Sequence, residues 1–522
     1  MSCNDPPLFN KGKASMMETS AAIDVSSMVD PPAFQASGPD RKRVRLSEGL
    51  TPPAVAAGVF DADDDDAMIT TSDSSPRSGS SHPIGPALVS DPNSADSYNQ
   101  IVMGPHAAVF NTWLPDDYSM SMSMGIKPDD SNSNHPPQDY YSSQIATYSG
   151  QLLQLKRRLW PTAEECARIC GTDPSSEWME ARGASNPLEL LGEGRAGGLN
   201  HMFMNRSAIK LANLDAILKK DLTAGTEGSH FLFVDLCGAP GGFSEYIMFR
   251  CRTDRRFPTC WGYGMSLIGP NEHGNGVKWK LHDKSMNFQG FHTQYVLCTG
   301  QDGTGDLYNW DNILSLQQQI QQDVAAKSNI PNTKKVDLVV ADGGFDAQRD
   351  SENQEELAQK LIVCQVAAGL LLLETGGKMV IKMFGFQKST TRAVMRSLYE
   401  AFDQVIFFKQ ISSRPASSER YVVCRGFKGL PSDWDGPKWI SSMLMGEELC
   451  FRNSPMDTRL HELINRFDRD LLALNIKTCF AILSYMERKT KAVGAGAENP
   501  NHWCKEPPEV NIDPYKQAWF LQ

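Results

Sequence analysis

The sequence predicts an α/β fold, a mostly parallel sheet with helices on both faces, and three observations support this prediction. Apolar strand-like runs alternate with helical segments from about residue 151 to residue 427. The run "FLFVDL" at 231–236 is almost continuously apolar, as expected for a strand buried on both faces of a sheet. A glycine-rich turn follows that run and leads directly into a helical segment. Strands that alternate with helices form parallel sheets that are covered on both sides.

The predicted elements follow one another in chain order. The first strand leads through the glycine turn into a helix, and the strands "WGYGMSL" and "YVLCTG" come next. A polar helix precedes "VDLVVADGG", a long apolar-rich helix precedes "GGKMVIKMF", and another helix precedes "QVIFFKQ" and "ERYVVCRGF". A short loop joins the last two strands, so the final strand is expected to run antiparallel in a Rossmann-like sheet. These elements span 231–236, 242–250, 261–267, 295–300, 312–326, 336–344, 354–374, 376–384, about 389 onward, 404–410 and 419–427.

Two regions flank this α/β domain, which we place at 151–430. Residues 1–150 are rich in Ser, Pro, Asp, Asn and Met without a sustained period, which predicts a disordered tail. The tail holds 19 acidic and 8 basic residues, so it carries the whole net charge of −11 and the rest is neutral overall. In the extension 431–522, an apolar stripe near 456–490 predicts a helix that packs on the α/β domain. Its members are Leu460, Leu463, Ile464, Phe467, Leu471 and Leu474.

Composition and short motifs limit the class of protein. The chain has no apolar run of about eighteen residues and no charged, apolar leader, so neither membrane insertion nor secretion is expected. The twelve cysteines form no CxxC pair, and we expect reduced thiols and no metal site. Cys166 and Cys170 would share one face of a helix. A basic cluster, Arg41, Lys42, Arg43 and Arg45, is typical of a nuclear localisation signal. The neutral domain neither requires nor excludes an RNA partner, because a local basic patch would be enough.

The glycine turn is a candidate cofactor site. Asp235 ends the first strand, and Gly238, Pro240, Gly241 and Gly242 precede the helix. Glycines allow a ligand to approach the backbone, and a helix N-terminus offers free N–H groups to an anion. The turn lacks the GxGxxG spacing that seats a dinucleotide pyrophosphate, which disfavours a nicotinamide-dependent oxidoreductase. A single carboxylate, such as that of S-adenosylmethionine, fits better; a tight connection without a ligand is the alternative.

Four ionisable residues are candidates for catalysis. Asp342 ends the strand "VVADGG", where its carboxylate would emerge at the carboxyl edge of the sheet beside the glycine turn. Lys382 lies inside the apolar strand "MVIKMF", and a buried lysine is costly unless it is paired. Glu419 opens the last strand, and Lys210 lies in a helical stretch before the first. A purely structural salt bridge is the alternative for Asp342 and Lys382.

These residues resemble the Lys–Asp–Lys–Glu tetrad of the FtsJ/RrmJ-like ribose 2′-O-methyltransferases. The segments "FMNRSAIKLANLD", "DLCGAPGGFSEY", "GYGMSL", "ADGGF" and "SRPASSERYVVCRGF" are similar to the cap-specific mRNA 2′-O-methyltransferases of that family. The resemblance covers roughly 150–430. It implies the methyltransferase variant of the Rossmann-like sheet, S-adenosylmethionine as cofactor, and methylation of the first transcribed nucleotide of 7-methylguanosine-capped mRNA.

The resemblance also implies roles for the tetrad. Lys382 would be the general base that relaxes the hydroxyl proton, because burial, a second lysine and the cationic sulfonium should lower its pKa. Lys210 would hold the hydroxyl, Asp342 would orient Lys382, and Glu419 would fix Lys210. Which lysine loses the proton is a question of coupled titration and stays open.

Two further groups of residues are implied as ligand contacts. The cofactor group is Asn205, Asp235, Cys237, Gly238, Ala239, Pro240, Gly241, Gly242, Phe243, Asp306 and Leu307. The capped-RNA group is Lys156, Arg157, Arg158, Leu159, Trp160, Arg182, Asn353, Gln354, Glu355 and Ser417. Asp306 can also be read as a solvated loop acid, and "LKRRLW" suits an amphipathic helix as well as an RNA contact. Ser417 stands where relatives carry asparagine, so one cap contact is expected to be shortened or lost.

Two other functions stay open. The same chemistry on ribosomal or transfer RNA would differ in not requiring the cap. A catalytically silent RNA-binding scaffold is disfavoured, because it has no reason to keep Lys382 in an apolar strand. The expected partners are the 5′ end of capped mRNA and the transcription or capping machinery, with a nuclear location and no membrane.

Overall fold

The computed structural model describes most of the chain between residues 139 and 495. The described stretches are 139–185, 202–225, 229–253, 259–268, 279–281, 287–288, 291–327, 330–344, 353–447 and 458–495. The basic cluster at 41–45 and most of the predicted tail lie outside these residues, and so does the end of the predicted extension.

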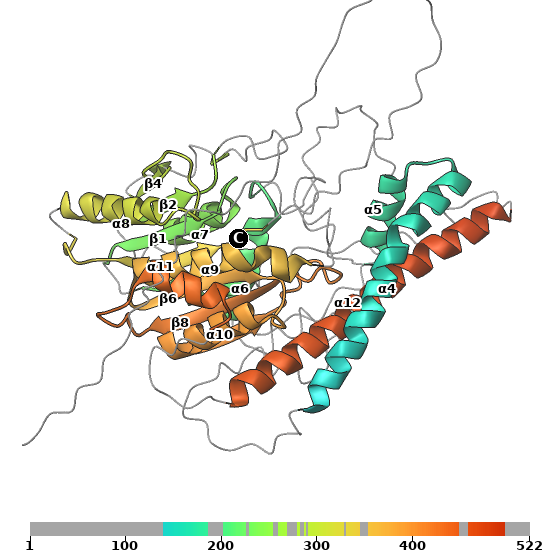
Figure 1. The fold of residues 1–522 in the computed structure, drawn as a ribbon. Coiled ribbons are helices and arrows are strands. Elements are labelled where there is room, and N and C mark those ends of the chain that lie inside the picture. Colours follow the sequence, from blue (N-terminus) through green and yellow to red (C-terminus); the bar gives the residue numbers. More distant parts are fainter. Residues whose placement is uncertain are drawn as a thin grey trace, which may run out of the picture. The chain divides into compact units, whose positions relative to one another are not determined.

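The described residues form one eight-stranded mixed sheet, as the alternating pattern predicts (Figure 1). Its order is β3-β4-β2-β1-β5-β6-β8-β7. Strand β8 pairs antiparallel with both β6 and β7, which confirms the expected antiparallel final strand. The strands are β1 (Phe231–Leu236), β2 (Thr259–Met265), β3 (Asn287–Phe288), β4 (Phe291–Leu297), β5 (Val336–Ala341), β6 (Leu373–Met383), β7 (Phe402–Phe408) and β8 (Arg420–Phe427).

The order of the strands reverses between β1 and β5. The chain runs outward from β1 through β2 to β4, and then returns to the other side of β1 with β5. Leu236 and Ala341 are register partners in this parallel pair, so Cys237 and Asp342 leave the sheet at the same edge. Open parallel sheets bind ligands at such a reversal point. The glycine turn after β1 lies there as well.

Helices cover both faces of the sheet and enclose two hydrophobic cores. Alternate residues of β1 point to opposite faces, Phe231 and Phe233 to one core and Leu232 and Val234 to the other. The first core lies under α6 (Arg206–Ile217) and α7 (Gly242–Thr253). The second lies under α8 (Trp310–Ala325), α9 (Gln354–Leu372) and α10 (Ser389–Ala401), together with α11 (Gly436–Leu444) from the extension.

Helix α12 (Thr458–Gly494) packs in two different ways along its length. Its first half buries Leu460, Ile464, Phe467, Leu471 and Leu474 in the larger core, which confirms the predicted stripe. Its second half packs on α4 (Asp139–Cys170) and α5 (Pro174–Ser185) through a third core. The sequence did not predict this third core.

Helix α4 begins at Asp139, within the segment that composition predicts to be disordered. Tyr141 and Ile145 are buried, and this helical spacing is hidden when composition is averaged over 1–150. Downstream, Leu152 and Leu159 are buried while Arg157 and Arg158 are exposed, so "LKRRLW" is part of an amphipathic helix. Among the described residues, no helix is both long and apolar enough to cross a membrane.

Candidate active site

Two buried lysine–carboxylate pairs stand at the carboxyl edge of the sheet. The Nζ atom of Lys210 lies 2.9 Å from Oε2 of Glu419, and the Nζ atom of Lys382 lies 3.2 Å from Oδ1 of Asp342. The four side chains are between 5% and 10% exposed. The structure thus brings together all four residues that the sequence predicts as a tetrad.

The fold explains why these four positions meet. Asp342 follows β5, Lys382 is the penultimate residue of β6, and Glu419 directly precedes β8. Lys382 is the register partner of Tyr421 in β8, so the beginning of β8 lies beside the end of β6. Lys210 is delivered from α6, whose N-cap is Asn205. Its position therefore depends on packing between helix and sheet, and not on strand register.

Asp342 is held by two hydroxyl groups in addition to Lys382. Tyr421 donates its hydroxyl to Oδ1 over 2.6 Å, and Ser207 donates its hydroxyl to Oδ2 over 3.0 Å. The carboxylate is therefore fixed from β8 and from α6. Sequence reasoning missed both partners, although Ser207 lies inside the motif "FMNRSAIKLANLD" and Tyr421 inside "SRPASSERYVVCRGF".

Glu419 lies in a strongly positive environment. Burial by itself would raise the pKa of this carboxyl, but the charges of Lys210, Lys382 and Lys409 outweigh burial and hold the pKa well below its usual range. Ser413 also donates its hydroxyl to Oε1 of Glu419 over 2.7 Å. Glu419 is therefore an anion that several cations share, which suits a residue that must hold a lysine in place.

The turn after β1 is built for close approach of its backbone. Cys237 adopts a φ of 56°, and its N–H donates to the carbonyl of Met265 over 2.7 Å. A Cβ atom at Gly238 would lie 2.1 Å from Cγ of Asp235, and one at Gly242 would lie 2.0 Å from Oδ1 of Asn205. Glycine is thus required at both positions. The amide of Ala239 donates to the hydroxyl of Ser266 over 2.9 Å and ties the turn to β2.

The other predicted cofactor residues differ in how deeply they are buried. Phe243 is buried, with its ring centroid 6.1 Å from that of Tyr421, and Leu307 is buried in the larger core. Asp306 accepts a hydrogen bond from the amide of Tyr308 over 2.8 Å in a half-buried loop. A Cβ at Gly305 would lie 2.0 Å from the carbonyl oxygen of Ser266, so this loop packs directly against the end of β2. Asp306 therefore belongs to the same edge of the sheet as the glycine turn.

Comparison with known proteins agrees with this geometry. Residues 203–427, which include the tetrad and the glycine turn, match the FtsJ-like methyltransferase family. The chain contains an FtsJ-like methyltransferase domain. The family predicted from the motifs is thereby confirmed.

Named relatives of the methyltransferase domain come from several animals. Cap-specific mRNA (nucleoside-2′-O-)-methyltransferase 1 of Homo sapiens is 31% identical over 275 residues, 51% of this chain and 30% of the relative. The protein of the same name from Xenopus laevis is 34% identical over 265 residues, 48% of this chain and 28% of the relative. This chain therefore spans less than a third of the length of these two relatives.

The predicted RNA contacts on α4 divide between two sides of that helix. The charge of Lys156 acts to lower the pKa of Lys409, which follows β7, and that of Cys479 in α12, so Lys156 lies on the side of α4 toward these two residues. Arg157 and Arg158 instead line a depression of about 350 Å³ between α4 and α12. Arg158 also forms an exposed ion pair with Glu487 at 2.7 Å. Successive residues of an α-helix point in different directions, so three in a row cannot all lie on one face. The linear motif did not show this division.

The remaining predicted RNA contacts are placed as follows. Ser417 accepts the amide of Glu419 on its hydroxyl over 3.1 Å and therefore helps to position the tetrad. Gln354, the first residue of α9, accepts a hydrogen bond from Ser418. Glu355 accepts the amide of Lys388 over 2.8 Å. Burial raises the pKa of the Glu355 carboxyl.

The other members lie in helices at the margins of the domain. Leu159 is buried in the core between α4 and α12, and Trp160 packs against that core. Arg182 lies in the last turn of α5, and Asn353 is the N-cap residue of α9. Their contact with RNA stays a prediction.

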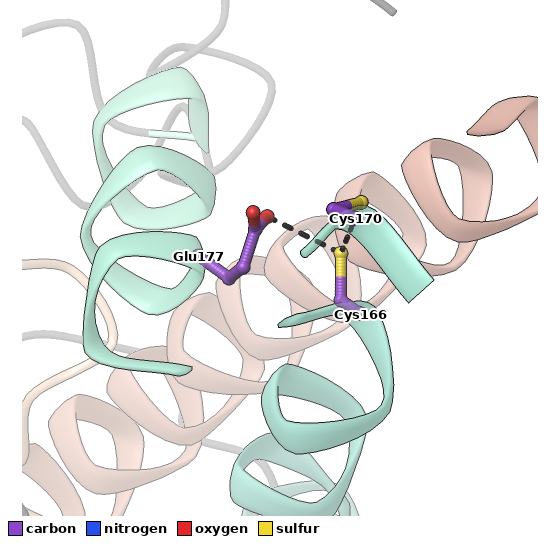
Figure 2. Close-up of side chains that lie close together, drawn as sticks. All are labelled: Cys166, Cys170 and Glu177. Atoms are coloured by element: carbon purple, nitrogen blue, oxygen red, sulfur yellow. Dashed lines mark hydrogen bonds between the residues drawn. The ribbon is translucent and has the colours of Figure 1, made fainter. Parts of the chain in front are cut away.

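Cys166 and Cys170 of α4 lie on one face of the helix, as predicted, and both are near Glu177 of α5 (Figure 2). The Cys166 Sγ atom lies 3.9 Å from that of Cys170 and 3.2 Å from Oε2 of Glu177. Burial, with the charge of Glu177, raises the pKa of Cys166 to about 12. Lys489 of α12 neutralises Glu177 at 2.8 Å. The cluster is therefore an ion pair packed against protonated thiols, and it joins α4, α5 and α12.

Proposed function

We propose that this chain transfers a methyl group from S-adenosylmethionine to the ribose 2′-hydroxyl of the first transcribed nucleotide of 7-methylguanosine-capped mRNA. The observation that carries the proposal is the pair of buried lysine–carboxylate contacts beside the glycine turn. Ribose methylation needs a group that relaxes the hydroxyl proton and groups that hold both reactants in line. The tetrad offers two lysines and two carboxylates at one place for these tasks.

The residues at the turn fit S-adenosylmethionine. Asp235 is fully buried, and although Ser244 donates two hydrogen bonds to its Oδ2, its Oδ1 accepts none. Burial raises the pKa of Asp235 to about 7, and the charge of Asp342 acts in the same direction. A bound ammonium group would satisfy Oδ1 and favour the anion. When bound, S-adenosylmethionine would supply an activated methyl group on a cationic sulfur.

The turn makes a testable contribution to binding of this cofactor. Replacing Gly238 by alanine should weaken S-adenosylmethionine binding at least tenfold, because the added methyl group displaces the Asp235 carboxyl that it would otherwise overlap. Isothermal titration calorimetry measures the change. The matched control is Gly183→Ala in α5, where a Cβ has no neighbour within 4 Å, and its affinity should equal that of the wild type. Equal affinity of both variants would contradict the assignment of the turn.

The side chains of the tetrad divide the work on the hydroxyl. Lys382, placed by Asp342 at 3.2 Å, would accept the hydroxyl proton in its neutral form. Lys210, held by Glu419, would donate a hydrogen bond to the hydroxyl oxygen and orient it. Both lysines lie close enough to Glu419 to lower its pKa, which supports a single coupled group.

The similarity to cap-specific relatives supports capped mRNA as the substrate, and Ser417, whose hydroxyl accepts the amide of Glu419, is a predicted RNA contact beside the tetrad. A nuclear location, through the basic cluster at 41–45, and contact with the transcription or capping machinery are parts of the same proposal.

The test is methyl transfer from labelled S-adenosylmethionine to matched short RNAs with and without a 7-methylguanosine cap. We expect label on the first ribose of the capped RNA alone. Equal label on uncapped RNA would move the substrate to ribosomal or transfer RNA and keep the chemistry. Cofactor binding without label on any RNA would favour the silent scaffold.

A further inference from the structure

Lys409, which directly follows β7, is a buried cation that the tetrad does not include. Its residue is 2% exposed, and its Nζ atom donates three hydrogen bonds. The acceptors are the hydroxyl of Ser413 at 2.9 Å, the carbonyl of Ser417 at 3.0 Å and the carbonyl of Glu419 at 2.7 Å. One lysine therefore fixes the loop that leads from β7 to Glu419 at three points.

A continuous chain of hydrogen bonds runs from Lys409 to Lys210. Lys409 donates to the Ser413 hydroxyl, and that hydroxyl donates to Oε1 of Glu419 over 2.7 Å. The other carboxylate oxygen of Glu419, Oε2, accepts from Lys210 over 2.9 Å. The hydroxyl hydrogen of Ser413 is directed to Glu419, so Ser413 can only accept from Lys409. Three acceptors need three N–H groups, and only the ammonium form of lysine has them.

Several charges act on this ammonium. Burial lowers the pKa of Lys409 to about 7. The negative charge of Glu419 raises this pKa, whereas the positive charges of Arg420, Lys210 and Lys156 lower it further. Positive charges that lower the pKa of one another act in both directions. The ammonium of Lys409 therefore opposes the positive charge of Lys210 and favours the anionic form of Glu419.

We propose that Lys409 is a positioning residue that, through Ser413, orients the carboxylate of Glu419 toward Lys210 and so sets the geometry of the reacting hydroxyl. Its consequence for the rate rests on the proposed methyl transfer, whereas its coupling to Glu419 does not. Asn475 of α12 supports the same loop, because its side-chain amide donates to the carbonyls of Pro415 and Ser417 at 2.6 Å and 3.0 Å.

The first experiment compares single-turnover methyl transfer to capped RNA as a function of pH in wild type, Lys409→Met and Ser413→Ala. The control is Lys378→Met, a largely buried lysine of β6 that pairs with Asp221 and lies four residues before Lys382. We expect the Lys409 variant to lose about 10- to 100-fold in rate, since a misplaced reacting group costs that much. The midpoint of the rising limb of the pH–rate profile should move to higher pH in both loop variants. Lys409→Met removes a positive charge, and Ser413→Ala removes a hydrogen-bond donor to Glu419. The control should keep the wild-type midpoint.

The second experiment does not need the methyl-transfer reaction. A double-mutant cycle of Lys409→Met and Glu419→Gln, read by urea unfolding, should be non-additive if the two side chains are coupled. Additive effects on the free energy of unfolding would overturn the proposal. A Lys409 variant that binds S-adenosylmethionine normally and keeps the wild-type rate of methyl transfer and the wild-type pH midpoint would overturn it as well. If that variant does not fold, Ser413→Ala decides by the same criteria. If the wild-type protein does not methylate capped RNA, that result counts against the proposed function. The double-mutant cycle then still tests the coupling between Lys409 and Glu419.

Discussion

Replacing Lys382 by methionine should lower the rate of methyl transfer by about 10²- to 10⁴-fold, the usual contribution of a general base. Methionine keeps most of the volume of the lysine in a strand where the residue is nearly fully buried, so the fold should persist. The variant loses the proposed general base, and Asp342 loses its ion-pair partner at 3.2 Å. Single-turnover kinetics with labelled cofactor and capped RNA measure the loss.

The same strand offers a matched control for this variant. Lys378 lies at the middle of β6, four residues before Lys382, so its side chain points to the same face of the strand. It donates to the carbonyl oxygens of Asp221 and Ala224, outside the tetrad. Lys378→Met should reduce stability and leave the rate within a few-fold of wild type. A Lys382 variant with the rate of this control would exclude Lys382 as the base.

Much of the fold was predictable because buried parallel strands have a strong sequence signal. Every strand expected in the α/β domain is present, and the placement of Lys382 among apolar residues correctly predicted a buried, paired lysine. The boundaries moved by a few residues, as in β6, which begins at Leu373 and not at 376. The ends of elements depend on caps and tertiary contacts, which a local pattern does not contain.

The groups that surround the tetrad could not be predicted in the same way. Tyr421 contacts Asp342 across 79 positions of sequence, and Ser207 contacts it across 135. Lys409 is close in sequence to Glu419. Its run "VIFFKQ", however, reads only as the end of a predicted strand, and nothing in it indicates a role at the site. These contacts follow from how α6 and the loop after β7 are packed on the sheet, and a single sequence does not record that packing.

The C-terminal helix is the part of the structure that changes the interpretation of the site most. The stripe on α12 predicted only that the helix packs on the domain. The structure shows that the same helix supplies Asn475 to the loop that carries Glu419, and Asp468 to Arg420, the residue after it. Because α12 continues onto α4 and α5, the helices that carry predicted RNA contacts are joined through it to the catalytic loop. The extension is therefore part of the architecture of the candidate active site.

Replacing Asp468 by alanine should lower the free energy of unfolding by about 3–5 kcal/mol, because it leaves a buried guanidinium without its counter-charge. The side chains of Arg420 and Asp468 are 5% and 3% exposed. The guanidinium carbon lies 5.2 Å from the ring centroid of Phe386, and the guanidinium also donates to the carbonyls of Ser418 and Phe384. With the carboxylate gone, the guanidinium keeps these neutral carbonyls and the more distant charge of Glu355, and no longer contacts a carboxylate directly.

Urea unfolding followed by fluorescence measures this loss, and an exposed ion pair of the same helix is the control. Glu487 pairs with Arg158 at 2.7 Å, but the two side chains are 43% and 58% exposed, so Glu487→Ala should cost about 1 kcal/mol or less. The rate of methyl transfer adds a second test, because Arg420 follows Glu419 directly. If α12 positions the catalytic loop, Asp468→Ala should lower the rate under conditions in which the protein is still folded, and Glu487→Ala should not. Equal stability and equal rates in the two variants would mean that α12 only covers the sheet.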